Sequence, residues 1–378
     1  MRPLDGIRVL DFSTLLPGPL ATLMLVEAGA EVIKIERPGR GDEMRSYEPK
    51  FGADAVNFGL LNRGKRSIAL DLKAPGAVDQ LMPLIRSADV IVEQYRPGVM
   101  DRLGLGYAAL SAVNPGLIYC SITGYGQSGP KAAEAGHDLN YVAETGMLSL
   151  AAGSDGAPVL PAALVADVGG GTYPAVVNIL MALLERNRTG KGCHLDIAMA
   201  DGMFTFLYWA MGNGLAAGQW PVPGGDLVTG GTPRYQMYRT ADGRFLAAAP
   251  LEDKFWASFC GLIGLPDEFR DDAKDPAATR QAVAGLIAGQ DSGHWRAAFA
   301  GKDVCCVVMS RMEEALANPH FRERGLFARR LAGQDGRTIT ALPTPLAASL
   351  RADAAETGYP ALGEANGDLL GSAPTSKE

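Results

Sequence analysis

The chain has 378 residues, of which 47% are hydrophobic and 20% charged, a composition typical of a folded globular protein rather than a disordered or fibrous one. Lys and Arg number 35 against 42 Asp and Glu, and the net charge of −7 argues against a nucleic-acid-binding surface. The length is sufficient for two compact domains, or for one large domain that carries a smaller inserted one.

The first 130 residues alternate between strand and helix patterns. Short apolar runs bounded by turn residues predict strands at residues 7–12, 30–36, 67–72, 90–93 and 117–122. Helical patterns lie between them, for example after Pro17-Gly18-Pro19 and over residues 76–87. Strands that alternate with helices pair in parallel, so we predict a doubly wound, Rossmann-like α/β sheet with ligands at the carboxyl ends of its strands.

The second half begins with one more unit of this kind and then changes character. We expect a long helix over residues 173–185, a strand over 194–198 and a helix rich in methionine and aromatic residues over 199–211. A Pro- and Gly-rich linker follows, and then a β-hairpin over 235–250 that turns at Asp242-Gly243. Helices at 255–262, 279–289 and 294–299 complete a smaller α+β unit.

These patterns predict a large α/β domain that is interrupted late in the chain by a smaller one. The expected boundaries are 1–215 for the large domain, 216–320 for the small α+β domain, and 321–378 for a C-terminal segment that returns to the large domain.

The remaining global features concern compartment and partners. The five cysteines form no CxxC pair, which favours reduced thiols over a disulfide framework or a metal site. The N-terminus has no signal-peptide core, and no uninterrupted apolar run approaches the roughly 18 residues of a membrane span. We therefore expect a cytoplasmic protein with no metal, no membrane and no nucleic acid among its partners.

Two glycine-rich stretches resemble nucleotide loops only in part. Gly124-Tyr125-Gly126-Gln127-Ser128-Gly129 matches G-x-G-x-x-G, but Pro130 follows at once and no acidic residue stands ready for a ribose. We interpret it as a loop that lets a ligand approach the backbone, with a nicotinamide dehydrogenase as a distant alternative. Residues 188–192 lack the upstream glycine and the Ser/Thr of a phosphate loop and are interpreted as a polar turn.

Basic residues cluster where the predicted sheet has its loops. Arg37 and Arg96 each precede a proline just after a predicted strand, and residues 62–66 (Asn-Arg-Gly-Lys-Arg) form a basic turn. Together they could clamp phosphates, whereas each one alone is typical of a solvated surface charge.

The most informative residues are a histidine and two carboxylates. His137 lies in a glycine-flanked turn, and Asp167 follows it thirty residues later, just before Gly169-Gly170-Gly171. A histidine and an aspartate can remove a proton from one face of a carbon and return one to the other. Each also has an ordinary interpretation: His137 as a polar turn residue, Asp167 as a helix N-cap, and Glu252 as a first-turn residue of its helix.

In combination the motifs resemble a known family. Residues 4–11, 29–36, 62–65, 95–99 and 360–364 are similar to the family III CoA-transferases, the CaiB/BaiF superfamily, and the resemblance covers essentially the whole chain. Within it, the Gly136-His137-Asp138-x-Asn140-Tyr141 motif, with Asp167 and Glu252, resembles the α-methylacyl-CoA racemase branch. CoA-transferases use the aspartate at the position of Asp167 as a nucleophile and usually lack the histidine.

The racemase resemblance implies interconversion of (R)- and (S)-2-methylacyl-CoA by 1,1-proton transfer through an enolate. His137 would serve one enantiomer and Asp167 the other, while Glu252 would hydrogen-bond and orient His137. A CoA-transferase with Asp167 as nucleophile is the alternative, and a non-catalytic acyl-CoA-binding protein is a second. Departures at 251–256 and 166–168 leave the acyl group open.

The resemblance also implies the surroundings of the pair. The backbone N–H of Asp138 would meet the enolate oxygen. CoA, which enters as part of the substrate with no tightly bound cofactor, would meet Arg37 and Arg96, with Lys65 nearby. Met199, Met203 and Met211 would form a pliable bed for the acyl chain, although plain core positions explain them equally well. The family forms interlocked homodimers in which the small domain of one subunit caps the site of the other.

Overall fold

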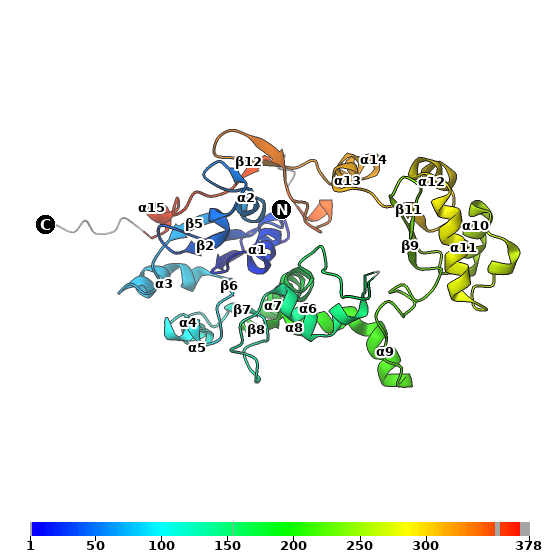
Figure 1. The fold of residues 1–378 in the computed structure, drawn as a ribbon. Helices are drawn as coiled ribbons and strands as arrows, with labels where there is room; N and C mark the ends of the chain where they lie inside the picture. Colours follow the sequence, from blue (N-terminus) through cyan, green and yellow to red (C-terminus); the bar gives the residue numbers. More distant parts are fainter. Residues whose placement is uncertain (1, 154, 352–355, 371–378) are drawn as a thin grey trace. The chain divides into compact units, whose positions relative to one another are not determined.

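The structure is a computed structural model that describes residues 2–153, 155–351 and 356–370 (Figure 1). The chain divides into two compact units, the first with Met1–Thr145, Pro161–Phe206 and Pro319–Glu378, the second with Gly146–Leu160 and Leu207–Asn318. The first unit therefore ends earlier than the expected boundary at 215, and residues 146–160 join the second unit instead of the large domain.

A six-stranded sheet in the order β5-β2-β1-β6-β7-β8 forms the centre of the first unit, and all of its strand pairs are parallel. All six strands expected for this unit are present: β1 (Arg8–Asp11), β2 (Glu31–Glu36), β5 (Arg66–Ala69), β6 (Val90–Glu93), β7 (Ile118–Thr123) and β8 (His194–Ala198). The chain moves outward from β1 to β5 and then outward from β6 to β8. Its topological switch point therefore lies between β1 and β6, the position at which open α/β sheets bind ligands.

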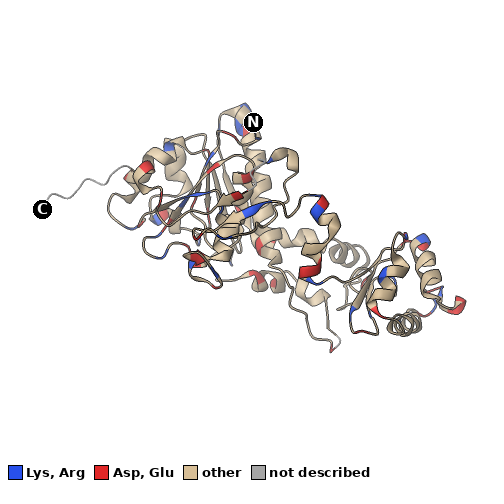
Figure 2. Ribbon diagram, turned by 90° about the horizontal axis from the view of Figure 1, so that it is seen from above, with Lys and Arg blue, Asp and Glu red and all other residues tan. Residues whose placement is uncertain are grey.

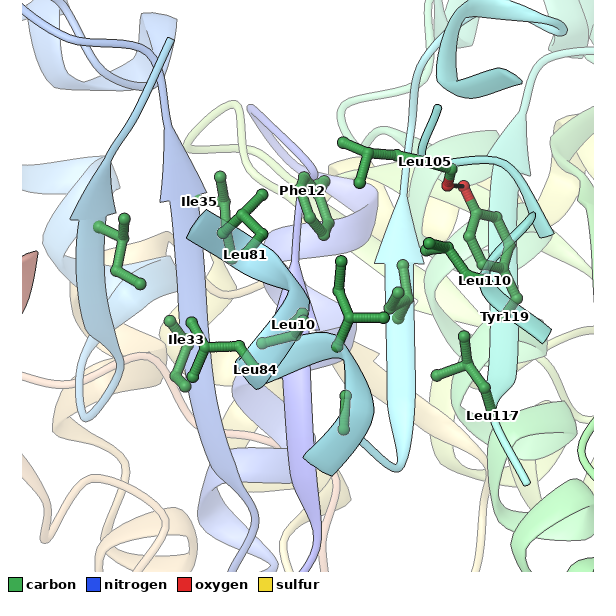
Figure 3. Packing of buried hydrophobic residues seen from close by; sticks show 14 of the residues in the cluster. Leu10, Phe12, Ile33, Ile35, Leu81, Leu84, Leu105, Leu110, Leu117 and Tyr119 are labelled. Carbon is green, nitrogen blue, oxygen red and sulfur yellow. Dashed lines mark hydrogen bonds between the residues drawn. The ribbon is translucent and has the colours of Figure 1, made fainter. Parts of the chain in front are cut away.

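Helices on both faces bury this sheet. On one face, α3 (Ala77–Ser87) lays Leu81 and Leu84 over Leu10 and Ile33 of the central strands (Figure 3). The short helices α4 (Val99–Arg102) and α5 (Tyr107–Val113) extend this core. Burial of a leucine or isoleucine contributes about 1.5–3 kcal/mol each, so this apolar layer fixes the strands whose ends carry the site.

The long helix that leads away from Asp167 lies against β7 and β8 and packs on α1 (Pro17–Glu27). It starts as a π-helical stretch, Ala166–Thr172, and continues as α7 (Tyr173–Thr189), so it is longer than the expected 173–185. Residues 166–189 are long and apolar enough to cross a membrane by length and composition, a test that the core helix of a soluble protein also passes. Ala175 and Ile179 are fully buried in the first unit, but only 39% of the apolar window is buried.

The C-terminal segment completes the first unit through short strands that the sequence did not predict. A hairpin of β3 (Lys50–Phe51) and β4 (Asp54–Ala55) leads into α2 (Val56–Asn62). Phe58 of α2 packs with Leu331 and Tyr359 from a three-stranded sheet of β12 (Arg330–Ala332), β13 (Thr338–Thr340) and β14 (Glu356–Gly358). Helix α15 (Asn366–Leu369) then docks beside β5, where the Ala365 N–H donates to the Ser67 carbonyl.

The second unit is a small α+β structure. The expected hairpin is confirmed as β9 (Gln236–Arg239) and β10 (Phe245–Ala248), with Gly243 in the turn at φ 78°, and β11 (Cys306–Val308) adds a third strand. Helices α10 (Asp253–Ile263), α11 (Pro276–Ala288) and α12 (Ser292–Phe299) pack on it.

The single helix expected over 199–211 is wrong: α8 (Met199–Met203), a 3₁₀ turn and α9 (Tyr208–Ala217) replace it.

Charged residues of both signs are interspersed along the elements of each unit (Figure 2). This distribution agrees with the small net charge relative to 35 basic and 42 acidic residues. Several charged side chains close to the site differ from this pattern, because they are buried next to the central strands.

Candidate active site

A cavity of about 370 Å³ lies in the first unit at the switch point of its sheet. Leu15 and Pro17, which follow β1, line it together with residues 94–97, which follow β6. His137, Asp167 and Met199 line the same cavity. The structure therefore brings the predicted histidine and aspartate to one ligand-sized space at the edge where such sheets bind their substrates.

The backbone around His137 is fixed by the next four residues. His137 precedes α6 (Asp138–Glu144), and its N–H donates to Oδ1 of Asn140 at 2.9 Å. The Tyr141 hydroxyl donates to the Gly136 carbonyl at 2.6 Å. A Cβ on Gly136 or Gly124 would lie 2.6 Å from the Tyr141 ring, so both positions require glycine. The motif thus holds an exposed imidazole on a rigid turn.

Asp167 is the second residue of the π-helical stretch and is partly buried. Burial, and next the negative charge of Asp138, raise the pKa of Asp167 to about 6, while His137 acts in the opposite direction. A carboxyl group with a pKa near 6 can exchange a proton in both directions near neutral pH, as an acid–base catalyst must.

The glycine run after Asp167 is explained by close backbone packing. A Cβ on Gly170 would lie 2.1 Å from the Met199 carbonyl oxygen, and one on Gly202 would lie 2.6 Å from Cα of Gly170. Only glycine therefore permits the stretch that carries Asp167 to touch α8. This contact places Met199 at the cavity, and its role in acyl binding stays a prediction.

Buried ion pairs shape the loop after β1. Leu15 has a left-handed backbone, with φ 62°, and its N–H donates to Oδ1 of Asp42 at 3.1 Å. Nζ of Lys34 lies 2.9 Å from the same carboxylate and donates to the Ser13 carbonyl at 2.7 Å. These contacts hold a strained loop against the cavity, and sequence analysis did not identify either Leu15 or Asp42.

The structure leaves Lys65 no free donor for a direct contact with CoA. Its ammonium group is fully buried and donates to Oδ2 of Asp11 at 3.0 Å, to Oδ1 of Asn62 at 2.8 Å and to the Pro19 carbonyl at 3.0 Å. An ammonium group has three donors, so none remains for a ligand. Burial lowers the pKa of Lys65 to about 8. Burial would raise the pKa of Asp11, but the positive charges of Lys65 and Lys34 outweigh it and hold that pKa below its usual value.

We expect Lys65→Met to lower the free energy of unfolding by about 3–5 kcal/mol, because it leaves the buried Asp11 carboxylate without its partner. The Michaelis constant for an acyl-CoA should stay within a few fold. Urea unfolding measures the first quantity, and Lys73→Met on the exposed surface serves as the control, with a change of about 0.5 kcal/mol or less. If Lys65→Met is stable and has a much higher Michaelis constant, Lys65 does bind the ligand.

The two arginines predicted to bind CoA lie in different cavities. Arg96 lines the cavity of His137 and Asp167, and across residues 2–153, 155–351 and 356–370 it forms no ion pair or side-chain hydrogen bond. Arg37 pairs with Glu43 at 3.0 Å and lines a second cavity with Arg40 and Arg45. A free guanidinium in the first cavity suits a ligand phosphate, and contact with CoA stays a prediction for both.

Glu93 is a buried residue that sequence analysis did not single out, and it supports the loop beside the cavity without lining the cavity itself. It ends β6, and its carboxylate accepts the Tyr95 N–H at 2.8 Å, which fixes the loop that carries Arg96. Burial raises its pKa to about 7. The sequence feature that could have identified Glu93 is its position at the end of a predicted strand next to the switch point.

The remaining predicted residues do not gather at this cavity. Met203 is fully buried in the first unit and is not among the residues that line it, so its assignment to the acyl bed is wrong. Met211 and Glu252 belong to the second unit, where Glu252 is exposed and directly precedes α10. Their roles stay predictions. Among the described residues, no group of three His, Cys, Asp or Glu side chains is placed to hold a metal ion.

The fold and the cavity define a doubly wound α/β protein with a histidine and a protonatable carboxyl group at its ligand-binding edge. The family model for CoA-transferase family III matches residues 4–366, and the chain belongs to this family.

Relatives with different activities are similar to this chain. An α-methylacyl-CoA racemase of Mus musculus is 36% identical over 97% of this chain and 92% of its own length. A succinyl-CoA:glutarate CoA-transferase of Mus musculus is 39% identical over 72% of this chain and 62% of its own length. A solved CaiB/BaiF family protein from Brucella suis superposes with a TM-score of 0.83 at 31% identity, over 97% of this chain and 98% of the other. Identity alone therefore does not separate the two activities.

Proposed function

We propose that the protein is an acyl-CoA racemase or epimerase that interconverts (R)- and (S)-2-methylacyl-CoA. The observation that carries this proposal is the second acid–base group: His137 lines the same cavity as Asp167. A transferase needs only the carboxylate that attacks the thioester. A racemase needs one group to remove a proton and another to supply one, and the cavity offers both.

The proposed reaction begins with neutral His137 and protonated Asp167. The imidazole takes the α-proton, the C–H bond breaks, and its electron pair moves toward the thioester oxygen to give an enolate. Asp167 then delivers its proton to the opposite face of the α-carbon, which leaves imidazolium and carboxylate. The reverse sequence starts from that ionic pair, so each enantiomer is converted by one protonation state of the same pair with no net gain or loss of protons.

The enolate oxygen requires hydrogen-bond donors. Asp138 is the first residue of α6, so its N–H has no partner within the helix, and we propose this group as the donor. Removing such a donor costs about 3–4 kcal/mol of barrier in other acyl chemistry. The free Arg96 guanidinium is proposed to hold the CoA portion of the substrate.

The alternative function is CoA transfer, with Asp167 as the nucleophile. The transferase relatives favour it, and an Asp167 with a pKa of about 6 is largely ionised above neutral pH, as a nucleophile must be. Attack on the thioester would form an acyl-aspartyl anhydride and release CoA thiolate. His137 would have no required step in that reaction.

Exchange in deuterated water tests the two functions against each other. The purified protein, given a 2-methylacyl-CoA and no acceptor acid, should incorporate one α-deuterium and racemise the thioester, as measured by mass spectrometry and chiral chromatography. The control arm adds a panel of carboxylic acids together with hydroxylamine to trap acyl-aspartate. Acid-dependent CoA transfer and trapped adduct without α-deuterium would establish the transferase.

A second copy of the chain is the proposed partner. The face of α7 that turns away from the sheet exposes five large apolar side chains at helical spacing: Tyr173, Val177, Leu180, Met181 and Leu184. A contiguous apolar stripe of this kind on a folded protein marks an interaction surface. The family resemblance implies a homodimer, and in it the second copy of the chain would cover this stripe.

A further inference from the structure

We propose that the Asp138 side chain is a positioning group that ties the segment carrying His137 to the segment carrying Asp167. This inference rests on the proposed function and deepens it. The peptide N–H of Asp138 is the proposed oxyanion donor, whereas the role assigned here belongs to its carboxylate.

The contacts join two segments that are far apart in sequence. Asp138 is buried, and its Oδ1 accepts the N–H of Ala166 at 2.7 Å and the N–H of Asp167 at 3.0 Å. Both donors lie in the first turn of a helical stretch, where N–H groups have no partner of their own. Asp138 therefore caps that stretch from another element, through charge-assisted hydrogen bonds.

The cap also fixes the two reacting groups relative to each other. Asp138 directly follows His137 at the start of α6, so the residue next to one acid–base group bonds the backbone of the other. Proton transfer to opposite faces of one carbon depends on this spacing, because misplacement by about 1 Å costs roughly 10²-fold in rate.

The cap has an electrostatic consequence as well. Free N–H groups at a helix start stabilise a nearby anion and would favour ionised Asp167. The Asp138 charge occupies those groups and, after burial, is the next cause that raises the pKa of Asp167. His137 opposes it. Burial, and next the charge of Asp167, raise the pKa of Tyr141 to about 12, and the Tyr141 hydroxyl donates to the Gly136 carbonyl instead of to Asp167.

Two substitutions separate position from charge. Asp138→Asn keeps an oxygen acceptor for both N–H groups but removes the charge, so the pKa of Asp167 should fall by about one unit. The acid limb of the kcat profile should move with it, while kcat at the new optimum stays within about tenfold. Asp138→Ala removes the acceptor, and kcat should fall by about 10²-fold with the Michaelis constant within a few fold.

The control is Asp201→Asn, an exposed acidic residue in α8, which should leave the profile and kcat unchanged. Carbon-13 NMR of labelled aspartate reports the pKa of Asp167 without any activity, and it still applies if Asp138→Ala does not fold. An unmoved Asp167 pKa and acid limb in Asp138→Asn would overturn the inference. A shifted pKa in a protein that exchanges no α-proton would instead leave the inference standing and refute the proposed racemase.

Discussion

Replacing His137 with glutamine is expected to reduce racemisation of a 2-methylacyl-CoA by about 10²–10⁴-fold. Glutamine keeps a polar side chain of similar length but cannot take or give a proton near neutral pH. Because Asp167 remains, the enantiomer that it serves should still exchange its α-proton with solvent, without inversion. Separate incubation of the two enantiomers in deuterated water, with chiral analysis of each product, measures this asymmetry.

Binding must be followed in parallel, because His137 also lines the cavity. Calorimetric titration with CoA should give a dissociation constant within a few fold of the unchanged protein. Leu139→Ala is a suitable companion, since Leu139 is exposed on α6 next to the same turn and should retain full exchange. If His137→Gln exchanges both enantiomers at the original rate, the histidine is not a base and the racemase proposal fails.

The sheet was predictable because its strands are buried on both faces. Such strands read as short apolar runs between Gly, Pro and charged residues, and all six expected runs became β1, β2 and β5–β8. Strands β12, β13 and β14 were missed because each has three residues and gains its stability from partners elsewhere, such as Phe58. The break between α8 and α9 was missed because the apolar pattern of residues 199–211 continues through it.

The site shows the same division between pattern and packing. His137 and Asp167 were identified from a motif, and the fold brings them to one cavity. The surroundings of Lys65 were not predicted because sequence shows a charge but not its burial, and its partners Asp11 and Asn62 meet it only in the folded chain. The Asp138 carboxylate was overlooked because its hydrogen-bond partners lie 28 and 29 residues away in sequence.

Asp167→Asn is expected to slow racemisation strongly and, at the same time, to stabilise the fold above about pH 6. Asparagine can neither exchange a proton nor attack a thioester, so racemisation should fall by about 10²–10⁴-fold, and any CoA transfer should stop as well. Activity alone therefore does not separate the two functions at this position. The free energy of unfolding adds information, because it depends on whether the Asp167 carboxyl group is neutral or ionised in the folded protein.

The sign follows from the two pKa values of Asp167. Its folded pKa is raised from 3.8 to about 6, first by burial and then by Asp138, so the fold favours the neutral acid. The stability that the neutral Asp167 acid contributes is fully present below about pH 4 and is lost as the pH rises through about 6. The unchanged protein thus loses stability over this window, whereas the Asn variant has no charge to bury.

We expect Asp167→Asn to exceed the unchanged protein by about 1–2 kcal/mol in free energy of unfolding at pH 7.5, after allowance for the partial exposure of this side chain. The difference should vanish near pH 3.5. Urea titrations at both pH values measure it, with Asp201→Asn as the matched control that should show no such gain. Equal or lower stability of Asp167→Asn at pH 7.5 would show that the fold favours the ionised carboxylate, which suits a permanent nucleophile rather than a group that holds and releases a proton.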